Sequence, residues 1–330
     1  MTRMHTEARS IEEPHAGASV DRARRGGLRR AKRRESLIAV LFLAPVLAFL
    51  GAFVAYPLAN AGMLSFFSWD GFSPREWVGL GNFSRLLGDG VFWSSLRNNV
   101  LIALAAIVFQ VGLGMVIAYW LVRVIPRFKR AAMFLYVIPV VISEICIGLL
   151  WQFVYNPYFG LLNGFLELVG LGGLNQGWLG DRNLAMPAVL VVMNLTYLGL
   201  YILLFVAAFQ DVDESVYEAA ALDGAGHFRT FFGVSVPMIF SNVQATVLLA
   251  VVTSFKTFSL VFVMTRGGPN NATDVISTYL FKTGFGNFEA GYASAIGIAQ
   301  LLITVVVGVA VVGMTRSRGS SPARVKGTAR

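Results

Sequence analysis

The sequence predicts an all-α polytopic membrane protein with six transmembrane helices. Of its 330 residues, 56% are hydrophobic and only 14% are charged, whereas about a quarter of the residues of a soluble domain are charged. The charges are also segregated, because charge-free runs cover 36–69, 98–122, 145–166, 183–210, 230–255 and 290–315. Each run is long enough for the ~20 residues that a helix needs to cross the hydrocarbon core.

The distribution of Lys and Arg predicts the orientation of these helices. Ten of the 27 basic residues lie before residue 37, four lie in Arg123–Arg130, and five lie from Arg316 onward. Cytoplasmic loops carry an excess of basic residues, so both termini are expected in the cytoplasm. The same rule puts 123–130 and 210–236 inside, and it puts outside the segments 60–96, 155–182 and 265–289. These tails explain the net charge of +9 without nucleic acid.

The elements follow from the same pattern. Residues 1–36 form a basic cytoplasmic tail that is polar and Arg-rich, and we expect it to be disordered. Residues 37–94 hold the first span and an external segment, and the span is too long for a signal-peptide core, which indicates an uncleaved anchor. A short amphipathic segment, 276–288, is expected on the outer surface, and 316–330 is a second basic tail. The six predicted spans are Leu37–Pro57, Asn99–Trp120, Ala131–Val154, Leu184–Phe209, Pro237–Met264 and Tyr292–Met314.

A polar island, Glu218–Pro237, separates two long apolar runs. Its alanines favour a helix, and Gly224 permits a turn that residues with a Cβ enter only at a cost. Glu218 is expected near the start of this helix, a second helix is expected over His227–Val236, and Pro237 suits the first turn of a new one. The island is therefore interpreted as a helix–turn–helix whose small residues let another protein approach, the alternative being a loop with an Ala-rich helix.

These residues resemble the EAA loop of ABC-importer permeases, with one departure, Ser241, where many relatives have a second Pro. The resemblance rests on Glu218, Ala219, Ala220, Asp223, Gly224, Ala225, Phe231 and Pro237. Three external stretches are similar to the sugar-type (MalF/UgpA-like) permeases of the ABC transmembrane type-1 family, namely Val78–Phe83, Trp151–Asn163 and Thr265–Thr273.

The resemblance implies a type-1 permease domain over 95–315, with a coupling loop at 210–236 that docks on a cytoplasmic ATPase. It also implies the partners: a second related permease, two ATPase subunits and an extracytoplasmic solute-binding protein. The substrate would be a sugar or a related polyol, and the sequence does not name which. The alternatives are an ABC permease for another solute and an ion-coupled secondary transporter that uses Glu144.

The sequence contains none of the usual catalytic or nucleotide-binding patterns. It has no GxxxxGK[ST] loop, so we expect no cofactor in this chain and ATP bound by a partner subunit. The three His residues, at 5, 15 and 227, have no metal-ligand spacing. The chain is therefore predicted not to be an enzyme and to hold no metal.

Two ionisable residues, Glu144 and Lys256, lie within predicted spans. A charge at the bilayer centre costs at least ~2.5–3.5 kcal/mol, so such residues usually face a cavity or a partner. Both are candidates for the translocation path, together with the polar Asn194 and Ser254. The alternatives are an ion pair, a Lys that reaches the outer surface, and polar side chains that tie one helix to another.

Overall fold

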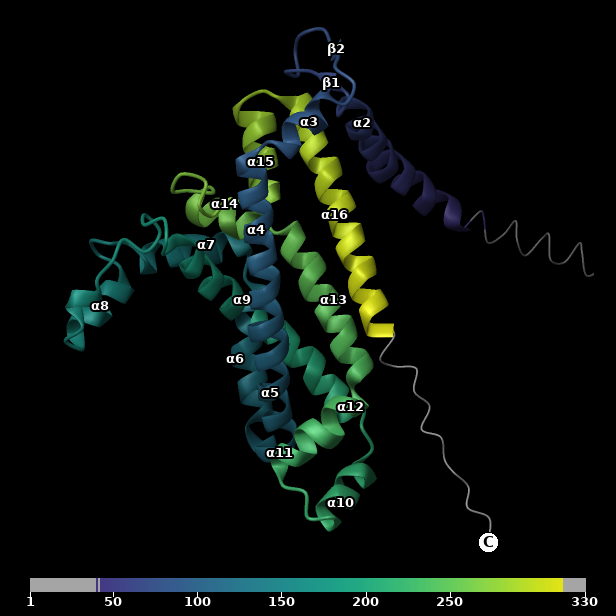
Figure 1. Ribbon diagram of the computed structural model, residues 1–330. Helices are drawn as coiled ribbons and strands as arrows, with labels where there is room; N and C mark the ends of the chain where they lie inside the picture. Colours follow the sequence, from purple (N-terminus) through teal and green to yellow (C-terminus); the bar gives the residue numbers. More distant parts are fainter. Residues whose placement is uncertain (1–39, 41, 317–330) are drawn as a thin grey trace, which may run out of the picture. The chain divides into compact units, whose positions relative to one another are not determined.

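The computed structural model describes residues 40 and 42–316, and these are mostly helical (Figure 1). Both tails and the start of the first predicted span lie outside the described residues. The α-helices are α2 (Tyr56–Leu64), α3 (Gly81–Leu87), α4 (Gly90–Ala105), α5 (Gly114–Tyr119), α6 (Lys129–Val141), α7 (Glu144–Val154), α8 (Leu161–Leu168), α9 (Ala185–Gln210), α10 (Glu214–Leu222), α11 (His227–Thr230), α12 (Val236–Met238), α13 (Phe240–Lys256), α14 (Ser259–Thr265), α15 (Ile276–Phe281) and α16 (Ala290–Arg316).

Short π-helical and 3₁₀ turns join several of these helices, and two short strands form a hairpin. The turns are η1 (Gly51–Ala55), η2 (Ala106–Leu113), η3 (Trp120–Val124), η4 (Pro126–Phe128), η5 (Gly172–Leu174), η6 (Phe231–Ser235) and η7 (Lys282–Gly286). Strands β1 (Phe67–Ser68) and β2 (Glu76–Trp77) pair antiparallel, with Phe67 opposite Trp77.

The described residues contain between four and six candidate membrane spans. Four helical runs are long and apolar enough to cross a membrane by themselves: Phe42–Leu64, Gly90–Val124, Ala185–Gln210 and Ala290–Gly313. They cover the predicted first, second, fourth and sixth spans. Two bent helix pairs supply two more if each pair counts as one span. The predicted number of six is therefore the upper value that the structure allows.

The third span is not the continuous helix predicted over Ala131–Val154. It is split into α6 and α7, whose axes differ by 97°. Pro139 lies inside α6 and removes one intrahelical hydrogen bond. The chain then becomes extended at Ile142 (ψ 140°) and Ser143 (ψ 134°) before α7 begins at Glu144. Glu144 consequently lies at a helix start and not inside a helix.

The fifth span also differs from the predicted helix Pro237–Met264. Pro237 lies in the first turn of α12, as expected, but α12 is the end of the helical run His227–Met238, and the long helix α13 begins only after a 77° bend at Ile239. The π-helical turn η6 ends two residues before this Pro, and such turns depart from the regular i→i−4 hydrogen bonds of an α-helix. The span is interrupted a second time after Lys256, where Thr257 and Phe258 separate α13 from α14.

The chain divides into two compact units, Met1–Asn60 and Ala61–Arg330. In the first unit, the side chains from Phe42 to Ala59 are all exposed, as expected of an apolar helix that lipid or another subunit would cover.

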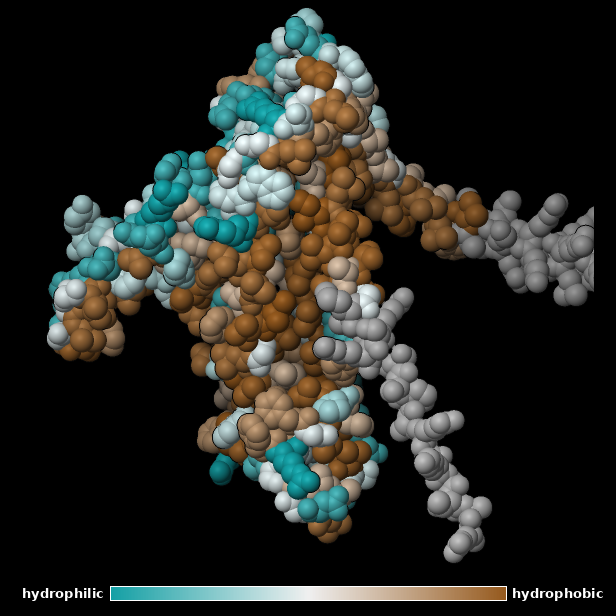
Figure 2. Space-filling view, in the orientation of Figure 1, coloured by the Kyte–Doolittle hydropathy of each residue, from teal (hydrophilic) through white to brown (hydrophobic). Residues whose placement is uncertain are grey.

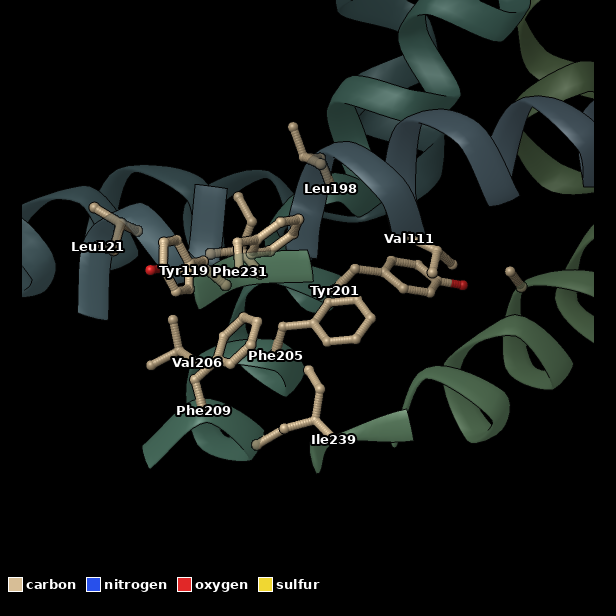
Figure 3. Packing of buried hydrophobic residues seen from close by; sticks show 14 of the residues in the cluster. Val111, Tyr119, Leu121, Leu198, Tyr201, Phe205, Val206, Phe209, Phe231 and Ile239 are labelled. Carbon is tan, nitrogen blue, oxygen red and sulfur yellow. The ribbon is translucent and has the colours of Figure 1, made fainter. Parts of the chain in front are cut away.

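The second unit is built around α9, whose buried side chains face α4, α5, α6, α13 and α14. Figure 3 shows its main apolar cluster, in which Tyr201, Phe205 and Phe209 of α9 pack with residues of α5 and η6. Glycines allow the closest approaches. A Cβ at Gly199 would lie 1.8 Å from the Tyr136 carbonyl oxygen, and one at Gly114 would lie 3.2 Å from the Tyr201 Cβ. Small residues of this kind bring membrane helices into close contact.

The segment 276–288 lies only partly on the surface predicted for it: residues 285–288 are exposed, whereas its first half is packed into the bundle. Ile276 and Thr278 of α15 are fully buried, because α15 packs against α4 and α16. Buried amides hold it there: the Asn99 side chain accepts from the Ile276 amide (3.0 Å), and the Asn98 side chain donates to the Asp274 carbonyl (2.8 Å). Figure 1 shows α15 and α3 at one end of this unit, and α10 and α11 at the other.

We expect Gly199→Ala to destabilise the protein, because the added Cβ has no space beside the Tyr136 carbonyl. Overpacking of this kind costs ~1–3 kcal/mol. Thermal unfolding of the purified protein in detergent would measure the loss. Gly164→Ala in α8 is the matched control, since a Cβ there meets no atom within 4 Å. Equal unfolding midpoints for the two variants would contradict the close contact.

Candidate functional site

The polar island folds as a helix–turn–helix, as the sequence predicts. The Asp213 side chain caps α10 by accepting from the Ser215 amide (2.9 Å), and this hydrogen bond lowers the pKa of Asp213. At the other end, Gly224 adopts the left-handed conformation (φ +72°). Its amide bonds the Ala221 carbonyl, and the Ala225 amide bonds the Ala220 carbonyl, both at 3.0 Å. Such a left-handed residue closes a helix most easily when it is Gly.

Most of the predicted coupling residues lie on one exposed surface. Glu218, Ala219, Asp223 and Gly224 are exposed, Ala225 is half-buried, and Ala220 faces inward with 8% exposure. Pro237 is exposed but lies apart from them in α12. Glu218 was expected near the start of the helix, and it lies in the middle of α10, because the helix starts at Glu214 after the Asp213 cap. The carboxylate of Glu218 therefore stands one turn into the helix.

Three large apolar side chains on the same loop were not singled out from the sequence. Leu222 is 89% exposed, Phe228 79% and Phe232 55%, and the two Phe rings lie 4.8 Å apart. Exposed apolar side chains grouped in this way are typical of protein interaction sites. The sequence does hold one signal for this apolar surface: the three side chains lie on both sides of Gly224, within a segment that separates two long apolar runs.

Arg123 fastens α10 to the helical run that ends in η3. Its guanidinium donates to Glu214 (2.6 Å) and lies over the Tyr217 ring, 3.3 Å from the centroid. The Arg123 side chain is only 15% exposed, whereas that of Glu214 is 68% exposed. The sequence placed Arg123 in a basic cytoplasmic turn, and nothing in the spacing of 91 residues indicates this partner. We call Arg123, Glu214 and Tyr217 the arginine clasp.

An aromatic group supports the loop from the membrane side. The Tyr119 ring lies 5.0 Å from Phe231 and 5.7 Å from Phe209 (centroid distances), both in near edge-on geometry (Figure 3). The Tyr119 hydroxyl also donates to the His227 carbonyl (3.2 Å). These contacts join α5, α9 and the α11–η6 segment into one packed layer.

A cavity of about 320 Å³ lies in the membrane part of the second unit. It brings together three of the four predicted path residues, Glu144, Ser254 and Lys256. Of the other lining residues, six carry polar groups and five are apolar: Gln110, Tyr197, Tyr201, Thr253, Thr257 and Ser259, and Ile102, Met193, Leu200, Leu249 and Phe258. We call this space the membrane pocket.

The two charged residues of the membrane pocket occupy helix ends. Glu144 is the first residue of α7 and Lys256 is the last residue of α13. The helix dipole favours an anion at the first position and a cation at the second. The Tyr197 hydroxyl donates to the Glu144 carboxylate. Among the residues that the structure describes, the salt bridges do not include a pair of Glu144 with Lys256.

The remaining two candidates differ in their surroundings. Ser254 is buried, its hydroxyl donates to the Ala250 carbonyl (2.7 Å), and its own carbonyl accepts from Asn99 (2.8 Å), so it ties α13 to α4. Asn194 does not reach the membrane pocket. It lines a separate apolar groove beside α9, and its amide donates to the Leu190 carbonyl (2.7 Å). In the described part of the chain, no cluster of His, Cys, Asp or Glu could hold a metal ion.

Comparison with known proteins gives relatives over most of the chain. It is 40% identical, over 279 residues, to the probable ABC transporter permease protein YurN of Bacillus subtilis, covering 83% of this chain and 94% of that protein. It is 34% identical, over 326 residues, to the diacetylchitobiose uptake system permease protein NgcF of Streptomyces coelicolor, covering 92% and 90%.

The fold is that of a solved importer subunit. A chain of the bacterial ABC transporter for the acidic polysaccharide alginate superimposes with a TM-score of 0.78 and 20% identity, covering 89% of this chain and 99% of that one. Residues 110–317, nearly two thirds of the sequence, match the family described as "Binding-protein-dependent transport system inner membrane component". The protein is therefore a multi-pass membrane permease subunit and not an enzyme, and it belongs to the family of binding-protein-dependent ABC transporter permeases.

Proposed function

We propose that this chain forms part of the translocation path for a sugar or polyol, and that it couples to a separate ATPase through the loop 210–236. Support for the substrate class comes from relatives named for diacetylchitobiose, lactose and starch degradation products. An ABC permease for a different solute remains the second candidate. The family match argues against an ion-coupled secondary transporter.

The partners proposed are a second related permease, two cytoplasmic ATPase subunits that bind ATP, and an extracytoplasmic solute-binding protein. The family description itself specifies transport that depends on a binding protein. The proposed orientation has both termini in the cytoplasm. Arg123 supports it, since this basic residue pairs with Glu214 of α10, next to the proposed coupling surface.

The observation that carries the proposal is how the loop connects to the membrane pocket. The loop links the end of α9 to the start of the α11–α13 segment, and both α9 and α13 supply walls of the pocket. The exposed surface of Glu218, Gly224, Leu222 and Phe228 offers the ATPase a protein contact. A force on this surface would reach the pocket along two helices.

The polar chemistry of the membrane pocket suits a hydroxylated solute. Glu144 and Gln110 offer acceptor oxygens, and Thr253, Ser259 and Tyr197 offer hydroxyl groups. Ligand sites combine a few such groups with apolar and aromatic walls, as this pocket does.

We expect Gly224→Asp to leave the subunit in the membrane but to abolish ATP-driven uptake. The added Cβ meets no atom of this chain within 4 Å, so the internal cost is the positive φ, ~1–2 kcal/mol, and the further cost falls on the ATPase contact. Uptake in vesicles with matched protein levels measures the effect. Gly226→Asp is the control, because that glycine is exposed with φ −72°.

Glu218→Lys should also uncouple transport, but through charge. A charge reversal on the ATPase should then partly restore uptake by the Glu218→Lys variant but not by the Gly224→Asp variant. The loss of uptake should be smaller for Glu218→Gln than for Glu218→Lys. Normal uptake by Gly224→Asp at wild-type membrane levels would disprove the coupling role of this loop.

Arg123→Met is expected to lower the uptake obtained per ATP hydrolysed, because α10 loses its fastening. An exposed ion pair contributes ~0.2–1 kcal/mol and a cation–π contact ~0.5–2 kcal/mol. The two contacts together contribute ~1–2 kcal/mol, so their loss should change the ratio of fastened to released α10 by roughly 5- to 30-fold. Arg127→Met is the control, since Arg127 is exposed nearby and stacks only on its neighbour Phe128. Additive effects of Arg123→Met and Glu214→Gln would contradict the arginine clasp.

Glu144→Ala should raise the concentration of the loaded binding protein needed for half-maximal uptake, without changing solute affinity in the binding protein itself. It leaves the Tyr197 hydroxyl unpaired, which costs ~1–3 kcal/mol, roughly a 5- to 150-fold effect. Asn194→Ala, in the separate groove, is the matched control. An equal effect of the two variants would show that the membrane pocket is not part of the translocation path.

A further inference from the structure

Helix α8 carries a row of uncovered apolar side chains. Leu161, Phe165 and Leu168 are 74%, 58% and 85% exposed, and their spacing of four and three residues puts them on one face of the helix. The exposed apolar surface continues before the helix with Tyr158 and Phe159, and after it with Val169, Leu171 and Leu174. We call this surface the α8 stripe.

The opposite side of α8 is fastened to the protein by polar groups. The buried Asn163 donates to the carbonyls of Pro157 (3.3 Å) and Gln176 (3.1 Å), and its side-chain oxygen accepts from the Trp178 indole (2.7 Å). Gly160, just before the helix, has no room for a Cβ, which would lie 2.2 Å from the Asn156 carbonyl oxygen. The contacts that fix α8 therefore also fix its apolar side in the outward direction.

Aromatic residues next to α8 indicate its depth relative to the membrane surface. Trp151, Tyr155 and Trp178 form a chain of ring contacts, with centroids 5.2 and 6.3 Å apart, and both Trp side chains are half-buried. Trp and Tyr accumulate where the hydrocarbon meets the headgroups. Figure 2 shows apolar side chains at the free end of the α8 segment, level with the apolar surface of the helix bundle, and hydrophilic residues above them.

We propose that the α8 stripe is a membrane-interface surface, buried among the acyl chains of the outer leaflet. The stripe lies level with the apolar surface of the helix bundle (Figure 2), and the family is described as an inner membrane component. Its members include no charged side chain, and the nearest carboxylate, Glu167, is turned to the other side, where it accepts from Asn175 (2.7 Å). Interfacial helices bury one apolar face in this way and keep their polar face in the headgroups.

A free interfacial helix usually needs basic residues to reach the membrane. Helix α8 has none, but it is tethered to the membrane spans through α7 and α9, so association is intramolecular and depends on apolar burial alone. The inference rests on the membrane location of the chain and, for the choice of the outer leaflet, on the proposed orientation. It does not rest on the substrate or the ATPase coupling.

Lipid contact can be measured in the assembled importer in nanodiscs that contain brominated phospholipid. Single cysteines are placed in a Cys146→Ser background and labelled with bimane, whose fluorescence bromine quenches on contact. The test positions are Leu168→Cys and Phe165→Cys. Glu167→Cys is the matched control on the polar side of α8, Val306→Cys on α16 reports a membrane span, and Phe72→Cys reports a water-exposed loop.

Quenching at positions 165 and 168 should match that at position 306 and exceed that at 167 and 72 by at least about twofold. Equal quenching at 167 and 168 would overturn the proposal. So would quenching that is present in the isolated chain and lost in the complete importer, because a second permease would then be the partner that covers the stripe. Fluorescence quenching reports lipid contact whether or not the variant transports. A negative result here would therefore contradict the lipid contact of the α8 stripe, and it would leave the proposed transport function untouched.

Discussion

The absence of water in the hydrocarbon core is the constraint on which this structure depends. Each interruption of a helix frees carbonyl groups that cost several kcal/mol if they stay unpaired there. Side-chain amides pair these carbonyls here. Asn99 and Gln300 donate to the carbonyls of Ser254 and Phe255 at the end of α13, and Gln152 donates to that of Val263 at the end of α14. The break after Lys256, at one wall of the membrane pocket, thus has two of its freed carbonyls paired by side-chain amides.

This explains why hydropathy predicted the helices but not their interruptions. Charge-free runs report how much chain can lie in lipid, and that property is local. The Phe255 carbonyl at the end of α13 is paired by Gln300, 45 residues later, whose amide reaches it (2.6 Å) only after the fold has formed. The same applies to Ile142, which carries no signal of its own for the 97° bend. Polar residues in spans were expected either to line a path or to tie helices. The Asn99 amide ties α4 to the backbone of α13, whereas the Ser254 hydroxyl bonds within α13 and Ser254 lines the membrane pocket.

In the candidate site, too, the features set by a single residue could be predicted from the sequence, and those set by distant contacts could not. Gly224 was predictable, because a positive φ selects for Gly at the level of a single residue. The place of Glu218 within α10 was not, since the helix begins where Asp213 caps it. Glu144 and Lys256 could be identified as costly charges, but their shared pocket follows from two breaks far apart in sequence. The arginine clasp joins residues 91 positions apart, which local patterns do not encode.

The packing of the second unit limits how a movement of the loop could reach the membrane pocket. Helix α9 is buried on most sides, and close-packed interiors transmit displacement instead of absorbing it. The α11–α12 segment, in contrast, meets α13 at the 77° bend of Ile239, where a small change of backbone angle can turn one helix against the other. The arginine clasp holds α10 to the Gly90–Val124 run, so the loop cannot move without one of its neighbours. Under the proposed coupling, α13 is therefore the element that would move relative to α9, and the distance between Lys256 and Tyr197 across the membrane pocket would change with it.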